Sequence, residues 1–128
     1  MGGALPYGAT VLEHFRRPRN QRKLERATVA RDGHNPLCGD RVRIELLIEN
    51  AIISDAAFTA NACAICTASA SLLTERVRGH SVDDAAAISD QDLLAALDAE
   101  LPPARLVCAI LPVRTLREAI AGAGPPLA

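Results

Sequence analysis

The stretch that decides the fold is RVRIELLIENAIISDAAFTANACAICTASASLLTERVR, residues 41–78, because its hydrophobic period changes near Asn61. In residues 41–49 apolar side chains alternate with charged ones, which is typical of a half-buried strand. The apolar positions of that strand are Val42, Ile44, Leu46 and Ile48. Asn50 marks a turn, so residues 52–60 are predicted to return as the second strand of an antiparallel hairpin. In residues 64–78 the period is about 3.6, which predicts a helix that ends at Gly79. The apolar stripe of that helix comprises Ile65, Ala68, Leu72 and Leu73.

Weaker patterns before and after this stretch complete the predicted fold. Residues 28–30 predict a short edge strand, and further helices are expected at 10–15, from 81, at 90–99 and at 106–121. No repeat or linker divides the chain, so we expect one α+β domain, a small antiparallel three-stranded sheet with helices packed on one face. The domain spans 1–128, with an ordered core at about 7–121. The tail at 122–128 is rich in Gly and Pro and is expected to be flexible.

The composition is that of a globular protein. The chain has 128 residues, 49% of them hydrophobic, and a net charge of −1. This charge balance argues against nucleic-acid binding. No window approaches the ~20 apolar residues of a membrane span. The first residues lack the charged and apolar regions of a signal peptide, so we expect a cytoplasmic protein. We also expect a monomer or a weak homo-oligomer.

The four cysteines carry most of the chemistry: Cys38, Cys63, Cys66 and Cys108. In a reducing compartment, spaced cysteines are more often metal ligands or reactive thiols than disulfides. Cys63 and Cys66 form a Cys-x-x-Cys motif, which suggests dithiol redox chemistry at a helix start. The predicted hairpin before this motif disfavours a thioredoxin-type site, because no βαβ unit is present. A zinc finger is also disfavoured, since no second Cys-x-x-Cys occurs.

Two of these cysteines and one carboxylate lie in a predicted turn or at a predicted helix start, where their side chains can reach one metal centre. The turn at residues 35–40, NPLCGD, contains Cys38 and Asp40. Gly39 between them lets the backbone bend so that both side chains reach one centre. Cys63 begins the long helix, where the helix dipole favours a thiolate.

Cys108 begins the last predicted helical stretch. Pro112 would clash with the carbonyl of Cys108 in a continuous helix, so the helix begins or bends there, unless Pro112 opens a separate helix. Three thiolates and a carboxylate suit a tetrahedral Zn²⁺ site or the binding edge of an iron–sulfur cluster. The alternative for each single cysteine is that it is buried and inert.

Five motifs follow one another in a distinctive order: YGATVLEHFRRPRN at 7–20, NPLCGD at 35–40, CAICTASAS at 63–71, RGHSVDDA at 78–85 and CAIL at 108–111. Together they resemble the iron–sulfur cluster assembly scaffold family, that of IscU, SufU and the N-terminal domain of NifU. The resemblance extends from Tyr7 to about Ile120. It implies the fold of that family and a scaffold or carrier function rather than enzymatic turnover.

The resemblance also implies a role for each site residue. It makes Cys38, Cys63 and Cys108 the ligand cysteines and Asp40 the carboxylate beside them. Either Zn²⁺ or a [2Fe–2S] cluster is then expected at this one site. Sulfur would arrive as persulfide from a cysteine desulfurase on one of the three cysteines, and the cluster would pass to apo-protein acceptors. An oxygen ligand binds iron more weakly than a thiolate does, so Asp40 favours release.

Two departures from the family pattern leave the function open. IscU-type members have a histidine where this chain has Val107. SufU-type members also lack that histidine, but they carry an insertion in the helical region. This chain has no room for such an insertion between Gly79 and Cys108. The first hypothesis is a cluster scaffold. The alternative is a SufU-like, zinc-dependent sulfur acceptor with a structural zinc. A third hypothesis is a thiol redox protein that uses Cys63 and Cys66.

Other residues have alternative interpretations as well. Residues 101–105, LPPAR, are close to the IscU loop that an Hsp70-type chaperone recognises, or they form a rigid loop between two helices. Cys66 is either a small buried hydrophobe, an auxiliary ligand or a resolving thiol that protects Cys63. His34 is a weaker candidate for an extra ligand, and His14 is expected to be structural.

Overall fold

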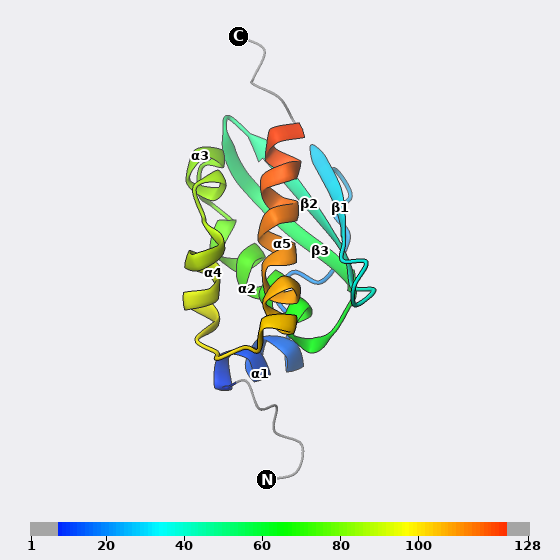
Figure 1. The fold of residues 1–128 in the computed structure, drawn as a ribbon. Coiled ribbons are helices and arrows are strands. Elements are labelled where there is room, and N and C mark those ends of the chain that lie inside the picture. The colour runs from blue at the N-terminus through cyan, green and yellow to red at the C-terminus, as the bar shows by residue number, and fades with distance from the viewer. Residues whose placement is uncertain (1–7, 123–128) are drawn as a thin grey trace.

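The computed structural model describes residues 8–122, which form a three-stranded antiparallel sheet and five helices (Figure 1). The strands pair in chain order and are β1 (Val29–His34), β2 (Arg41–Glu49) and β3 (Ile52–Asn61). The helices are α1 (Ala9–Arg16), α2 (Ala64–Val77), α3 (Val82–Ala86), α4 (Asp90–Leu97) and α5 (Pro103–Gly122). Figure 1 shows the helices gathered over one face of the sheet, so the predicted α+β architecture is confirmed. None of the helices within residues 8–122 has the length and apolar character that a membrane crossing needs.

The β2–β3 hairpin forms where the alternating pattern predicts it. Ile44 of β2 is completely buried and lies opposite Phe58 of β3, which is also completely buried. Asn50 and Ala51 make the connection with φ of 54° and 63°. Positive φ at both central residues is what a two-residue hairpin turn of the right twist requires. The hairpin therefore returns the chain to the end of the sheet at which β2 began, where Arg41 pairs with Asn61.

Helix α2 is the central helix, and more of it is buried than the predicted amphipathic stripe. Ten of its 14 residues are buried, because α1, α4, α5 and β3 all pack against it. Leu72, which was assigned to the stripe, is only half-buried. Small residues at 68–71, ASAS, allow such close packing on several sides. The Ser69 hydroxyl donates a 2.6 Å hydrogen bond to the carbonyl of Ala109, which links α2 to α5.

Helix α5 and strand β1 are both longer than predicted. Strand β1 continues to His34 and pairs with β2 along its whole length. Helix α5 begins at Pro103, three residues before its predicted start, and is continuous through Pro112 to Gly122. Proline suits the first position of a helix, because an N–H there would have no acceptor within the helix. Cys108 therefore lies in the second turn of α5 and not at its start, so that prediction was wrong. Of the predicted flexible tail, Gly122 belongs to α5 and 123–128 lie outside the described residues.

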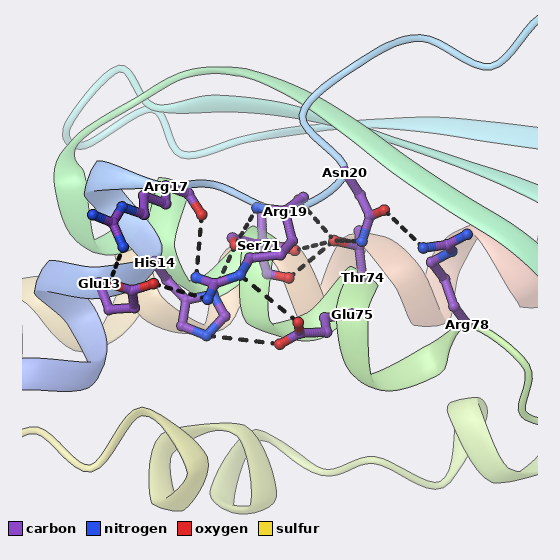
Figure 2. Close-up of polar contacts among 10 residues, drawn as sticks. Glu13, His14, Arg17, Arg19, Asn20, Ser71, Thr74, Glu75 and Arg78 are labelled. Carbon is purple, nitrogen blue, oxygen red and sulfur yellow. Dashed lines mark hydrogen bonds and ion pairs between the residues drawn. The ribbon is translucent and has the colours of Figure 1, made fainter.

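A polar cluster fixes α1 and the segment after it onto α2 (Figure 2). His14 Nδ1 lies 2.7 Å from the Ser71 hydroxyl, and the backbone N–H of Arg19 donates to the same oxygen at 2.8 Å. Figure 2 shows Glu13 and Glu75 on the two sides of the Arg19 guanidinium, with which both form ion pairs. Burial lowers the pKa of His14, and the positive charge of Arg19 lowers it further. His14 is thus a buried, neutral anchor for α1.

Candidate metal centre

The loop between β1 and β2, residues 35–40, is held in a tight turn by its own hydrogen bonds. The backbone N–H of Asn35 donates to the Asp40 carbonyl at 2.9 Å, and the Gly39 N–H donates to the Asn35 carbonyl at 2.8 Å. Gly39 has a φ of 77°, which is accessible to glycine without strain. The side chain of Asn35 also takes part, because its Oδ1 accepts the N–H of Leu37 at 3.1 Å. This turn fixes Cys38 and Asp40 relative to each other.

The turn and α5 bring two cysteines that are 70 residues apart in the chain into contact. Cys38 Sγ lies 3.4 Å from Cys108 Sγ, and both cysteines are free thiols. Cys38, Cys108 and Asp40 each offer a ligand atom, and these atoms all lie within 4.8 Å of one another. Cys38 is exposed, whereas Cys108 is completely buried and Asp40 is 5% exposed. The group therefore has one member at the surface and two beneath it.

Asp40 connects this group to the start of α2. Its Oδ1 accepts the backbone N–H of Cys63 at 3.1 Å. Cys63 is the N-cap residue of α2, so Asp40 accepts the backbone N–H of the residue at which the helix begins. A carboxylate at a helix N-terminus is favoured by the helix dipole. The Cys63 sulfur lies outside the close group, but its backbone is joined to a member of it.

The second carboxylate oxygen of Asp40 indicates that these residues fit a metal ion. Asp40 Oδ2 is buried and has no hydrogen-bond partner. A buried, unpaired charged oxygen is costly, and a cation beside it removes that cost. Two sulfurs bound to one tetrahedral Zn²⁺ at about 2.3 Å would be about 3.8 Å apart. Because the Cys38 and Cys108 sulfurs are already 3.4 Å apart, the donor set fits zinc or a thiolate-bound iron with little rearrangement.

Without a metal, the buried cysteines of this region are held as thiols. Burial raises the pKa of Cys108, and the adjoining Cys38 sulfur raises it further. Burial likewise raises the pKa of Cys66, and the negative charge of Asp40 adds to that rise. A metal bound by Cys108 must therefore displace its proton, so binding and deprotonation are linked.

The structure does not bring every sequence-predicted candidate into the group. Cys66 is completely buried and packs in the hydrophobic core, which favours its interpretation as a small hydrophobe. His34 ends β1 with an exposed side chain and is not a member of the group. Two features were not predicted from the sequence: the hydrogen bond between Asp40 and the start of α2, and the buried side chain of Asn35. The Asn-Pro dipeptide was a usable signal for Asn35, since asparagine side chains commonly hydrogen-bond to the backbone two residues on.

Comparison with known proteins places this chain in one family. The family described as "NifU-like N terminal domain" matches residues 6–122. The chain is 35% identical over 122 residues to the iron–sulfur cluster assembly scaffold protein IscU of Escherichia coli (strain K12), with 91% of this chain and 93% of the relative covered. It is 30% identical over 132 residues to the zinc-dependent sulfurtransferase SufU of Bacillus subtilis (strain 168), with 90% and 89% covered.

A solved structure has the same fold. The N-terminal region of a nitrogen-fixing NifU-like protein from Brucella abortus superimposes with a TM-score of 0.73 at 20% sequence identity, over 91% of this chain and 92% of that one. This similarity shows the shared fold, and the match to residues 6–122 shows the shared ancestry. The chain therefore belongs to the family of NifU-like N-terminal domains, together with IscU and SufU.

Proposed function

We propose that this protein is a scaffold on which an iron–sulfur cluster is assembled and from which the cluster is passed on. The observation that carries the proposal is the contact between Cys38 Sγ and Cys108 Sγ, 3.4 Å apart, beside the buried and unpaired Oδ2 of Asp40. Membership of a family whose relatives include the cluster assembly scaffold IscU supports the same function.

The proposed ligand set is Cys38, Asp40, Cys63 and Cys108. Cys63 completes it because it begins α2 directly beside Asp40, to which its backbone donates a hydrogen bond. Thiolates are soft ligands that suit iron–sulfur clusters and zinc, whereas a carboxylate oxygen is harder and exchanges more easily. Three thiolates therefore hold the cluster during assembly, and Asp40 provides the position at which an acceptor protein's ligand enters.

The proposed sulfur donor is a cysteine desulfurase that carries a persulfide. Cys38 is the exposed thiol of the close group, so it is the first that a persulfide on another protein can reach. The Cys38 thiolate attacks the outer sulfur of the donor persulfide, and the donor cysteine leaves as a thiolate. Cys63, which is half-buried, and Cys108, which is buried, receive sulfur only after a rearrangement of the site.

A second candidate function is a SufU-like, zinc-dependent sulfur acceptor in which zinc stays bound to the site. Val107 favours this alternative, since it stands where IscU-type relatives have a histidine beside the last cysteine. Its apolar side chain packs against the hydrophobic core and has no ligand atom. The relative SufU of Bacillus subtilis is named a zinc-dependent sulfurtransferase.

We extend the proposal to an Hsp70-type chaperone that binds residues 101–105. Pro102, Pro103 and Ala104 are exposed, which leaves the middle of this segment accessible. Leu101 is half-buried and packs against the core, and Pro103 already belongs to α5. Binding of all five residues in an extended form therefore requires the first turn of α5 to open.

Metal and acid-labile sulfide analysis distinguishes the two functions. The full chain is purified anaerobically and analysed before and after incubation with a cysteine desulfurase, cysteine and ferrous iron. The scaffold function predicts equal amounts of iron and sulfide in the incubated protein, lost in Cys38→Ser. Zinc that iron does not displace, together with a persulfide on a cysteine, would instead support the sulfur acceptor. Absence of metal in both preparations would contradict both functions.

A further inference from the structure

Two buried side-chain atoms among the described residues lack a hydrogen-bond partner, and both belong to the loop 35–40. One is the acceptor Oδ2 of Asp40. The other is a donor, the Nδ2 amide group of Asn35. Buried polar groups are normally paired, so each exception needs a physical explanation. A metal ion explains the unpaired oxygen, but it cannot accept a hydrogen bond and leaves the unpaired N–H unexplained.

Every other polar group of Asn35 is used to hold the loop. Its backbone N–H donates to the Asp40 carbonyl, and its own carbonyl accepts the Gly39 N–H. Its side-chain Oδ1 accepts the Leu37 N–H at 3.1 Å. The amide cannot turn over without losing that bond, so Oδ1 and Nδ2 keep their positions. With only 8% of the residue exposed, water does not readily reach the remaining donor.

We propose that Asn35 Nδ2 donates a hydrogen bond to an anionic sulfur in the loaded site. This inference rests on the proposed function, because only a loaded site contains such a sulfur. Cys38 is three residues from Asn35 in the same turn, and its thiol becomes a thiolate once a metal displaces the proton. The sulfides of a cluster are anionic acceptors of the same kind. Either sulfur gives Nδ2 the partner that it lacks, while the metal gives one to Asp40 Oδ2.

The proposed bond makes Asn35 a positioning residue with a measurable effect on the cluster. Hydrogen bonds to cluster sulfurs stabilise their negative charge and shift the reduction potential of the cluster. A charge-assisted hydrogen bond contributes enough that its loss changes an equilibrium or a lifetime by about tenfold. The loop itself does not depend on Nδ2, so the donor can be removed while the turn is kept.

Asn35→Asp and Asn35→Ser test the proposal as a pair. Aspartate keeps the oxygen that accepts the Leu37 N–H and replaces the donor by an oxygen, but it also adds a negative charge. Serine is neutral, and its short hydroxyl still supports a turn of this kind. Asn61→Asp is the matched control for charge, because Asn61 is exposed and lies two residues before Cys63. Circular dichroism confirms that each variant is folded before loading.

The readouts are the lifetime of the reconstituted cluster in visible absorption and the dissociation constant for Zn²⁺. We expect both Asn35 variants to shorten the cluster lifetime about tenfold relative to wild type and Asn61→Asp. If zinc affinity falls in parallel in Asn35→Ser, the acceptor is a ligand thiolate. If zinc affinity is unchanged, the acceptor is a cluster sulfide. Wild-type cluster lifetime and zinc affinity in both Asn35 variants would overturn the proposal.

Two further observations separate this proposal from the proposed function. A wild-type protein that takes up no cluster contradicts the scaffold function. The dissociation constant for Zn²⁺ of Asn35→Ser then decides whether Asn35 donates a hydrogen bond to a ligand thiolate. Should the variants not fold, resonance Raman spectra of the loaded wild-type protein decide the matter. Fe–S stretching bands that shift in D₂O are the result expected if Nδ2 donates to sulfur, and bands that do not shift overturn the proposal.

Discussion

The backbone N–H of Cys63 donates a 3.1 Å hydrogen bond to Oδ1 of Asp40, and this bond joins two of the proposed ligand residues. Asp40 lies just before β2, and Cys63 lies just after β3. The hairpin brings these positions together, since Arg41 at the start of β2 pairs with Asn61 at the end of β3. Asp40 thus has one oxygen committed to the N-terminus of α2 and one oxygen left unpaired for a metal.

Asp40→Asn is expected to stabilise the metal-free protein. Asparagine keeps an oxygen that can accept the Cys63 N–H, and it removes a buried negative charge that has an unpaired oxygen. We expect the free energy of unfolding to rise by about 1 kcal/mol. Asp40→Ala is the comparison variant and should gain less, because it also loses the acceptor of the Cys63 N–H. Urea denaturation in the presence of a chelator measures both, and a metal-free Asp40→Asn protein less stable than wild type would contradict this account.

Asp40→Ala is also expected to make an assembled cluster longer-lived. The exchange-prone oxygen ligand is gone, so the route by which an incoming ligand enters is lost. The decay of visible absorption after anaerobic reconstitution, with and without an apo-protein acceptor, measures the lifetime. A cluster that decays faster in this variant would count against the role assigned to Asp40.

Gly33→Ala is expected to disturb the metal centre by displacing α5. A methyl group at Gly33 of β1 would clash with the side chain of Thr115 on α5, whose hydroxyl donates to the Leu111 carbonyl. Overpacking of this kind costs about 2 kcal/mol of stability. It should also weaken zinc binding, because β1 leads into the loop with Cys38 while α5 carries Cys108. Thr115→Ala in the same chain should restore part of both losses, and an undiminished stability of the single variant would refute the close packing.

Protonation of His14 is expected to destabilise the protein at acidic pH. Burial and Arg19 lower its pKa in the folded state from the ordinary 6.5, against the opposing charges of Glu75 and Glu13. The unfolded chain then binds more protons, so the free energy of unfolding falls as the pH falls below about 6.5. Denaturation at a series of pH values between 8 and 5 measures the slope. His14→Gln should flatten it, and an equally steep slope in that variant would assign the effect to other groups.

Cys66→Ala is expected to leave metal binding intact. Cys66 is completely buried in the core and is not a member of the close group, so its loss removes packing rather than a ligand. We expect a cost of about 1 kcal/mol in stability from the small cavity and an unchanged zinc content. In a dithiol redox protein that uses Cys63 and Cys66, the same variant would lose all activity. A loss of bound metal or of sulfur acceptance would therefore indicate that Cys66 is an auxiliary ligand or a resolving thiol.

The predictions that relied on period and turn chemistry agree with the structure. The alternation in residues 41–49 and the turn at Asn50 identify the hairpin, because one face of β2 is buried and a two-residue turn sets the register. The bend at Gly39 was likewise predictable, and the ligand atoms of Cys38 and Asp40 lie within 4.8 Å of each other.

The predictions that differ from the structure involve either tertiary contacts or a proline whose local role was misjudged. The stripe predicted for α2 faces the core but is too narrow, because helices pack on several sides of α2 and bury Ser69 and Thr74 as well as apolar residues. The start of α5 was placed too late because Pro103 looks like a helix breaker, although it is well suited to the first helical position. The unpaired atoms of Asn35 and Asp40 could not be predicted from sequence, since they depend on which groups are buried together.

X-ray absorption at the zinc edge of the zinc-loaded protein tests the central claim, which is that Cys38, Asp40, Cys63 and Cys108 bind one metal. We predict three sulfur neighbours at about 2.3 Å and one oxygen neighbour at about 2.0 Å. In Cys63→Ser the sulfur number should fall to two. A wild-type spectrum with two sulfurs or fewer, or with a nitrogen neighbour from a histidine, would contradict the proposed centre.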